Sequence, residues 1–398
     1  MIEKIIFNVL ALGFFTITFL KLIKKNDTSY IYLLALEFIG LAINFIELFL
    51  VIKLNLFWRV VTYILSVALP LIVLYLENAK KVDFPEMFNV TVAKFLERLG
   101  KNEQAKLIIS NFLNKNPNSY IAHKYMAEYY EKEQNYDAAI SEYIRVTDLK
   151  RNDFESTYKL CEALNKNKQN EQSIELLEEI LKQKPEYEKA SNLLGEILFE
   201  EERYKQAISV YMASLKYHPA SYDLYYSLGM AYTMINDFQR AKEFYSKAAE
   251  INSLMYNAKL NLGQIALIYG DLDEAENYFM QSIKDENLES GSYYYLSQIA
   301  LLKGDKDKAI NYINVAIQLE PQIYKQVEKD PLFKPIKSNI NIPKENQKTI
   351  SNLSSKEKRV NRHLMKTCIL VKNLSKEDIQ QVKFAKQKEM EQEEKQKE

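Results

Sequence analysis

The chain has 398 residues, with 53 basic and 53 acidic side chains and a formal net charge of zero. This balance gives no electrostatic basis for binding nucleic acid, which depends on an excess of Lys and Arg. Glycine and proline are scarce, at nine residues each, which suits an all-helical protein. The two cysteines, Cys161 and Cys368, do not form the pattern of a disulfide framework or a metal site.

Three apolar stretches fill the first 78 residues, at about 5–23, 30–52 and 56–76. Each is near the roughly 20 residues that a helix needs to cross a bilayer, and each is apolar on all sides. The first stretch has no small-residue cleavage site after it, and Lys24 and Lys25 follow instead, so we interpret it as a retained span. The sequence predicts a three-helix transmembrane bundle at 1–78 and a linker at 79–85.

The basic residues near these spans predict their orientation. More of them lie in the first loop and after the third span than in the second loop: Lys21, Lys24, Lys25, Lys80 and Lys81 against Lys53. With three spans, the first loop and the segment after the third span share one side of the membrane, which we expect to be the cytoplasm. The prediction is a multi-pass protein of the cell membrane, with its N-terminus outside and the rest of the chain inside.

Four polar side chains lie within the second and third spans, namely Glu37, Asn44, Glu47 and Arg59. Glu47 and Arg59 are about equally far from the turn near 53–55, so an antiparallel hairpin brings them to similar depth and we expect them to pair. Glu37 and Asn44 are seven residues apart and share one helix face, which suggests contact with another helix. These groups either stabilise a small bundle or form a path for a proton or ion.

One pattern returns every 34 residues from 86 to 323. Its seventh position is large and apolar: Val92, Met126, Leu160, Leu194, Leu228, Leu262 and Leu296. Its eighth position is small: Ala93, Ala127, Cys161, Gly195, Gly229, Gly263 and Ser297. Position 20 is Ala or Ser in every repeat, and position 24 is a large aliphatic or aromatic residue. The register gives seven repeats, at 86–119, 120–153, 154–187, 188–221, 222–255, 256–289 and 290–323.

Each repeat predicts two helices. Within 222–255, apolar residues recur at helical spacing up to Met234, Asn236 and Asp237 interrupt the run, and the spacing resumes at Phe238. The 34-residue period and its columns resemble the tetratricopeptide repeat (TPR), a helix, turn and second helix. The resemblance implies an all-α, right-handed solenoid with a concave face, because no repeat buries its apolar face alone. Gly229→Trp is therefore expected to unfold its neighbourhood.

The TPR resemblance also implies which residues line the concave groove, at positions 2, 5, 9, 12 and 13 of each repeat. The early repeats present mostly charged side chains there: Lys94, Glu97, Lys124, Glu128, Glu131, Glu162, Lys166 and Glu196. The later repeats present an apolar run: Tyr226, Met230, Met234, Leu260, Leu267, Ile268, Tyr294, Leu301 and Leu302. We expect this run to bind a helix or an extended peptide with apolar anchors.

The chain after the last repeat contains another possible occupant of this groove. Residues 324–337 resemble a capping helix, and 338–398 are predicted to be a linker followed by a charged helical tail. An apolar cluster at 364–374 could fold back into the groove; the alternatives are an external partner or a second copy of the chain. A basic patch is interpreted as a solvated charge run rather than a contact with acidic lipid or a partner: Lys356, Lys358, Arg359, Arg362 and Lys366.

The sequence contains no phosphate-binding glycine loop, nucleophile motif or metal-ligand spacing, so we expect neither an enzyme nor a cofactor. The interpretation is a membrane-anchored TPR scaffold or adaptor, bacterial by analogy, that binds a protein or peptide for assembly or quality control at the membrane. The alternative is a regulatory subunit of a transporter or envelope-biogenesis complex whose function lies in the transmembrane part. The sequence predicts no oligomeric state.

Overall fold

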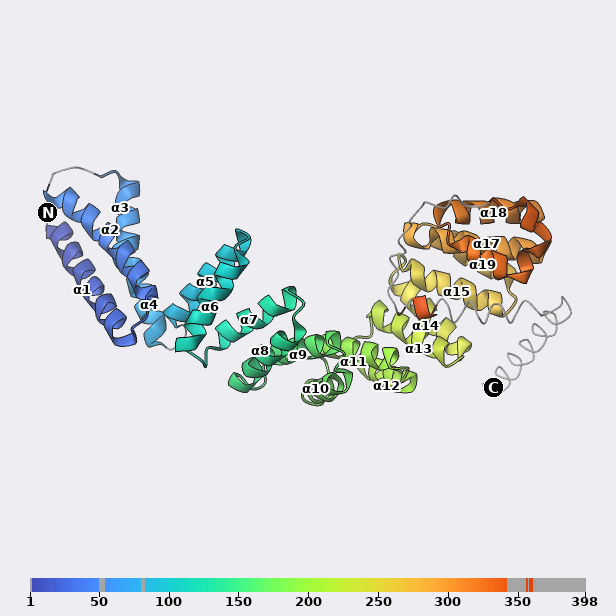
Figure 1. The fold of residues 1–398 in the computed structure, drawn as a ribbon, viewed down its shortest axis with the longest axis horizontal. Coiled ribbons are helices and arrows are strands. Elements are labelled where there is room, and N and C mark those ends of the chain that lie inside the picture. Colours follow the sequence, from blue (N-terminus) through green and yellow to red (C-terminus); the bar gives the residue numbers. More distant parts are fainter. Residues whose placement is uncertain (1, 50–53, 80–82, 342–355, 357, 361–398) are drawn as a thin grey trace. The chain divides into compact units, whose positions relative to one another are not determined.

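The computed structural model describes residues 2–49, 54–79, 83–341, 356 and 358–360. These residues form helices and connecting turns, with no strand among them (Figure 1). The chain divides into two compact units, Met1–Ser173 and Ile174–Glu398, and each is described by itself. The predicted all-α class, with apolar N-terminal helices followed by a helical-repeat solenoid, is confirmed.

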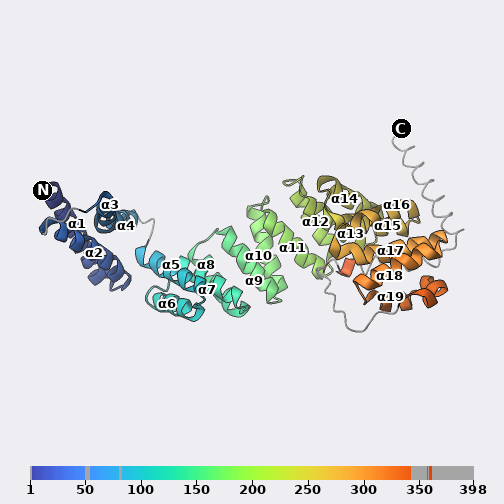
Figure 2. The ribbon, with the colours of Figure 1, turned by 90° about the horizontal axis from the view of Figure 1, so that it is seen from above.

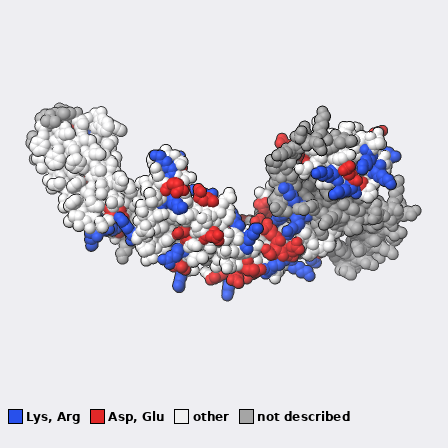
Figure 3. Space-filling view, viewed as in Figure 1, with Lys and Arg blue, Asp and Glu red and all other residues white. Residues whose placement is uncertain are grey.

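The first unit begins with three helices that are long and apolar enough to cross a membrane: Lys4–Lys25, Ser29–Phe49 and Leu56–Asn78. The first two lie within α1 (Ile2–Lys25) and α2 (Ser29–Phe49). The third is continuous through α3 (Leu56–Tyr63), a π-helical turn η1 (Ile64–Ala68) and α4 (Leu69–Asn78). Among the described side chains on the visible face of this domain, charges gather only near one end, whereas they are spread over the repeats (Figure 3).

The π-helical turn has a local cause that the sequence analysis missed. Pro70 has no N–H with which to satisfy the carbonyl four residues earlier, and a widened turn is one way to accommodate a proline inside a helix. The same stretch faces α2 closely, because a Cβ added at Gly40 would lie 2.9 Å from the Ser66 Cβ. Ser66 donates a hydrogen bond of 2.6 Å to the Thr62 carbonyl. Gly40 therefore allows the second and third spans to touch at this turn.

Helix pairs follow in chain order, as Figures 1 and 2 show. Those that begin in the first unit are α5 (Phe84–Arg98), α6 (Asn102–Lys115), α7 (Tyr120–Lys132), α8 (Tyr136–Leu149), α9 (Phe154–Lys166) and α10 (Asn170–Gln183). The second unit continues with α11 (Glu188–Glu200), α12 (Tyr204–Leu215), α13 (Tyr222–Met234), α14 (Phe238–Ile251), α15 (Tyr256–Ile268), α16 (Leu272–Ser282), α17 (Glu286–Lys303) and α18 (Lys306–Leu319). Two short helices complete it, α19 (Ile323–Lys329) and the 3₁₀ helix η2 (Pro331–Asn339).

The turn inside each repeat contains one residue in the left-handed conformation, always at position 15. Three repeats use glycine there, Gly100, Gly270 and Gly304. The other four use residues with a side chain: Gln134, Lys168, Glu202 and Asn236, with φ between 58° and 62°. A non-glycine residue in this conformation costs about 1 kcal/mol, so the packing of the two helices must outweigh local preference in these repeats.

Packing within a repeat depends on the small residue at position 8 facing the large residue at position 24. An added Cβ would lie 2.2 Å from the Tyr211 ring at Gly195, 2.6 Å from the Tyr245 ring at Gly229, and 2.9 Å from the Phe279 ring at Gly263. All three rings are fully buried. The two columns therefore form one continuous contact, in which a ring on the second helix occupies the space that a glycine leaves on the first.

Candidate binding site

The predicted apolar groove is largely interior in the structure. Five of its nine residues are buried: Tyr226, Met230, Leu260, Leu267 and Tyr294. The other four are half-buried: Met234, Ile268, Leu301 and Leu302. Leu260, Leu267 and Tyr294 belong to one core cluster, against which Ile268, Leu301 and Leu302 pack. The structure therefore places five of the nine predicted groove residues in the interior of the array, and a partner-binding role for the nine stays a prediction.

Contacts with the next repeat and the end of the array explain this burial. The Tyr226 ring lies 5.5 Å from the Tyr245 ring, and its hydroxyl accepts a hydrogen bond of 3.4 Å from Asn261. The Tyr294 hydroxyl donates to the Asp330 carboxylate at 2.9 Å, and its ring lies 5.6 Å from the Phe333 ring. Large side chains at position 5 thus reach the following helices and fill the space between repeats.

A short piece of the C-terminal region lies against the repeat at 188–221. The Lys356 Nζ is 5.2 Å from the centre of the Phe199 ring and 5.7 Å from that of the Tyr211 ring, both cation–π distances. It also lies 3.4 Å from the Tyr211 hydroxyl. Burial raises the pKa of Tyr211, so this hydroxyl stays neutral beside the ammonium group. Val360, four residues further on, is fully buried.

Arg359 contacts the end of helix α11. Its guanidinium donates a hydrogen bond of 3.0 Å to the carbonyl of Glu200, the last residue of that helix, and lies 3.9 Å from the Glu202 carboxylate. Carbonyls at a helix C-terminus have no partner within the helix and attract cations. Lys356 and Arg359 therefore make specific contacts, so the interpretation of this patch as solvated charge is wrong for these two residues. The cluster at 364–374 lies outside the described residues.

These contacts fall where the repeat resemblance puts the concave face. Phe199 and Glu200 are positions 12 and 13 of their repeat. The predicted groove residues of the last three repeats are not among these contacts, and their role in binding stays a prediction. In this repeat an aromatic ring, a helix end and an acidic residue provide the contact surface instead, with Phe199 and Tyr211 buried and Glu200 and Glu202 exposed.

The charged early repeats form ion pairs along the same positions. Lys132 lies 3.3 Å from Glu97, and Lys166 lies 2.7 Å from Glu131. A pocket of about 340 Å³ lies beside the first of these pairs. Its lining consists of Lys94, Glu97, Arg98, Tyr125, Glu128 and Lys132. Charged side chains therefore line this part of the array, as the sequence predicted.

Among the three apolar helices, Glu47 and Arg59 form the predicted pair. The Arg59 guanidinium contacts Glu47 Oε1 through Nε at 3.0 Å and through a terminal nitrogen at 2.9 Å. Lys4 lies 3.0 Å from the same oxygen, so the acidic group has a second cationic partner that the sequence analysis missed. The Glu47 side chain is buried between the three helices, and two cations compensate for its removal from water.

Glu37 and Asn44 are both buried on the inner side of α2. Glu37 accepts a hydrogen bond of 2.7 Å from Thr18 of α1. These contacts are inside the bundle, consistent with the shared face that the sequence predicted. Thr18 was not identified in advance because its role depends on how α1 packs against α2.

The end of the helical bundle that holds Glu77 contacts the segment that leads into the first repeat. Glu77 pairs with Lys21 and Lys25, and accepts a hydrogen bond of 2.5 Å from Tyr30. Lys25 also lies 2.8 Å from Asp83, directly before α5. These ion pairs and the Tyr30 hydrogen bond join the three apolar helices to the beginning of the array.

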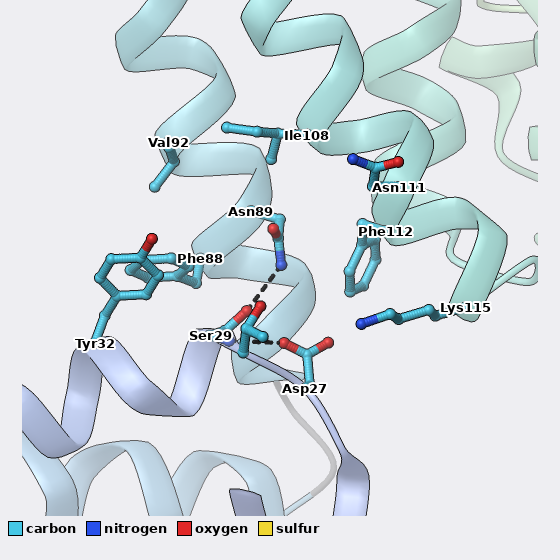
Figure 4. Close-up of a pocket in the computed structure, with 11 residues that line it drawn as sticks. Asp27, Ser29, Tyr32, Phe88, Asn89, Val92, Ile108, Asn111, Phe112 and Lys115 are labelled. Atoms are coloured by element: carbon cyan, nitrogen blue, oxygen red, sulfur yellow. Dashed lines mark hydrogen bonds between the residues drawn. The ribbon is translucent and has the colours of Figure 1, made fainter.

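A pocket of about 290 Å³ lies at this junction, between the start of α2 and helices α5 and α6 (Figure 4). Tyr32 and Phe88 stack on one side of it, with ring centres 5.0 Å apart. Asn89 of α5 donates a hydrogen bond of 2.9 Å to the Ser29 hydroxyl. Lys115 reaches toward the same hollow from α6 in Figure 4.

Two sequence families match the repeat region: one is a domain of a tetratricopeptide repeat protein and the other is the tetratricopeptide repeat itself. The C-terminal ARM domain of tetratricopeptide repeat protein 21 matches residues 77–192, and a tetratricopeptide repeat family matches residues 198–255 and 260–322. The chain belongs to the tetratricopeptide repeat family. No curated protein matches this TPR chain.

One solved TPR structure shares the fold of the array, and two further solved structures match part of the chain. The C-terminal part of a TPR repeat-containing protein from Cytophaga hutchinsonii is 17% identical, with a TM-score of 0.52, over 60% of this chain and 98% of that one. MamA from Desulfovibrio magneticus RS-1 is 21% identical, with a TM-score of 0.39, over 42% of this chain and 93% of that one. YrrB, described as a TPR protein with an unusual peptide-binding site, is 20% identical, with a TM-score of 0.38, over 46% and 93%.

Proposed function

We propose that this TPR protein is a membrane-anchored scaffold or adaptor that binds a protein or peptide partner in its concave groove, for assembly or quality control at the membrane. The observation that supports the proposal is the contact of Lys356 and residues 358–360 with the repeat at 188–221. The Lys356 ammonium group lies over the Phe199 ring, and the Arg359 guanidinium binds the carbonyl of Glu200 at the end of a helix. A segment of the chain's own polypeptide therefore contacts positions that the TPR resemblance assigns to the groove.

The chemistry of this contact defines the ligand class. An ammonium group over two aromatic rings, a guanidinium on an unpaired helix carbonyl and one buried aliphatic side chain suit a basic helical peptide with an apolar anchor. The chain's own segment acts as a resident ligand, and a partner with the same features replaces it. Met234, Ile268, Leu301 and Leu302, the half-buried members of the predicted groove, extend the partner's contact along the later repeats.

Three features support attachment to the cell membrane. The first 78 residues contain three helices of spanning length and hydropathy. Glu47 in these helices is paired with Arg59, and Lys21 and Lys25, near the end of the first helix, pair with Glu77. Glu37 is buried without a cationic partner among the described residues, and it accepts a hydrogen bond from Thr18. Charge asymmetry favours the array in the cytoplasm and the N-terminus outside; Lys53, Lys80 and Lys81, used in that argument, lie outside the described residues.

A second candidate function puts the activity in the membrane part, as a subunit of a transporter or envelope complex. The buried Glu37 and the π-helical turn in the third span favour it, since such turns often occur at functional sites. The Glu37→Gln variant distinguishes the scaffold function from a function in the membrane part. An amide keeps the acceptor for Thr18 but cannot exchange a proton, so a scaffold keeps its activity in this variant and a proton path loses it.

A competition experiment tests the resident-ligand proposal. A fluorescent peptide with the sequence of residues 352–374 is titrated into the full-length protein in lipid nanodiscs. We expect the Lys356→Ala/Arg359→Ala variant to bind the peptide at least ~10-fold more tightly than the wild type, because its own segment no longer competes. Lys334→Ala, an exposed cation on the cap, is the matched control.

Two results would contradict the proposal. The first is equal binding of the peptide by the wild type and the double variant. The second is undiminished binding of a peptide that itself carries alanine at positions 356 and 359, because the two cationic contacts would then contribute nothing.

A further inference from the structure

The first helix pair of the array has an exposed apolar stripe. Met87, Phe95 and Leu99 on α5 and its end are 43%, 59% and 55% exposed, and Leu107 of α6 is 60% exposed. Phe95 and Leu99 are four residues apart and share one helix face, and large apolar side chains exposed together on a face indicate a surface that is covered in the working protein.

The stripe continues a contact that already exists. Phe84 belongs to a core cluster with Tyr30 and Leu33 of α2, and Phe88 stacks on Tyr32. Residues 84, 88, 95 and 99 follow one another at helical spacing, so they lie along one face of α5 and its end. Phe84 and Phe88, at the beginning of this face, contact the second apolar helix, as Figure 4 shows for Phe88. Phe95 and Leu99, towards its end, are exposed.

At the C-terminal end of the array, two short helices cover the last repeat. Terminal repeats in solenoids normally have a polar or covered outer face. After the last repeat, Ile323, Val327, Phe333 and Ile336 of the two short helices are buried in the core cluster that includes Ile313. Among the described residues, no helix covers the first repeat in this way. The first repeat lies next to the proposed membrane domain.

We propose that helices α5 and α6 lie on the bilayer, with Met87, Phe95, Leu99 and Leu107 among the lipid headgroups and upper acyl chains. The inference rests on the proposed membrane placement of the three spans. A lipid surface is the occupant that the geometry favours, because the Asn89–Ser29 hydrogen bond and the Phe88–Tyr32 stack hold α5 beside the end of a spanning helix.

The polar surroundings of the stripe suit this location. Arg98 and Lys101 flank Leu99 and are exposed, as cations beside an apolar face commonly are in helices that bind anionic membranes. Phe88 belongs both to the stripe and to the wall of the pocket of about 290 Å³ in Figure 4, so the hollow between α2 and the pair opens next to the lipid-facing side chains. The first repeat thereby fixes the array to the membrane surface.

Tryptophan fluorescence tests the proposal, because the chain has one tryptophan, Trp58, in the third span. Three single-tryptophan proteins are compared in liposomes with and without brominated lipids: the wild type, Phe95→Trp in a Trp58→Phe background, and Ile144→Trp in the same background. Ile144 is 45% exposed on α8 and serves as the matched control. Leu99→Trp replaces Phe95→Trp if that variant does not fold.

We expect brominated lipids to quench Trp58 and the tryptophan at position 95 by at least ~2-fold, and to leave the tryptophan at position 144 unchanged. Quenching of Trp58 alone, with the position-95 signal accessible to acrylamide, overturns the inference and leaves the membrane anchor intact. A blue-shifted position-95 signal that brominated lipids do not quench overturns it in favour of a protein cover. Absence of quenching at Trp58 removes the membrane placement and the inference together.

Discussion

Replacing Gly229 by alanine tests the packing rule on which the array is built. A Cβ at this position would lie 2.6, 2.7 and 2.9 Å from three atoms of the Tyr245 ring, whereas carbon atoms normally approach to about 3.5–4.0 Å. The ring has little room to withdraw, since it is fully buried, lies 5.5 Å from the Tyr226 ring and has its hydroxyl 3.3 Å from that of Thr233.

Two opposing effects decide the size of the change. Alanine in a helix interior is favoured over glycine by about 0.5–1 kcal/mol, and overpacking a core costs about 1–3 kcal/mol. Because the ring is confined, the cost of overpacking lies in the upper part of its range and exceeds the gain from alanine. Gly229→Ala is therefore expected to destabilise its repeat by about 1–2 kcal/mol. Gly291→Ala is the matched control in α17, where an added Cβ meets no described atom within 4 Å, and it is expected to stabilise its helix by up to about 1 kcal/mol.

Hydrogen exchange of the full-length protein in detergent gives the local opening free energy of α13 and α14 for the first variant and of α17 for the second. The account predicts opposite signs for the two changes. Equal stabilisation by both would refute the reasoning, because it would mean that the ring moves away at no cost and that the small column is not required for close packing.

Three further predictions concern charged and thiol groups. Exchanging Glu47 and Arg59 is expected to restore membrane insertion only in part relative to either single change, because Lys4 then faces an arginine; full rescue would show that the Lys4 contact is unimportant. Lys303 and Lys308 of the array hold the pKa of Glu276 below its usual range, so its stabilisation is present above the unfolded pKa and is lost as the pH falls through the folded pKa. Glu276→Gln should therefore lower the opening free energy of α16 by less than about 1 kcal/mol near neutral pH, an effect that disappears in acid. Burial raises the pKa of Cys161 to about 12, so iodoacetamide at mildly alkaline pH should modify it only after unfolding, as mass spectrometry of its peptide would show.

The fold was predictable because its determinants are local and repeated. A 34-residue period, a small residue at one position and a large one sixteen positions later specify two helices and their contact, and the structure places Gly195 against Tyr211 accordingly. The turns at Gly100, Gly270 and Gly304 were predictable, because glycine is the residue that most readily adopts the left-handed conformation. The turns at Gln134 and Lys168 were not, because there tertiary packing imposes a left-handed residue that local preference disfavours.

The binding surface was harder to predict, since position in a repeat does not determine exposure. Tyr226 and Tyr294 occupy groove positions, but their length lets them reach the next helices and become interior. The contact between Lys356 and Phe199 joins residues more than 150 positions apart, and no sequence periodicity encodes such a pair. Glu47 and Arg59 are the contrasting case, because a short hairpin makes equal distance from the turn a reliable guide to contact.

Photocrosslinking in the native membrane tests the central claim most directly, with a photoreactive amino acid in place of the exposed Glu200. We expect the full-length protein to crosslink to its own Lys356 or to residues 358–360, and we expect Lys356→Ala/Arg359→Ala to replace this product by a crosslink to a separate protein. A self-product that survives the double substitution, or the absence of any protein product once the segment is released, would contradict a groove that exchanges its own segment for a partner.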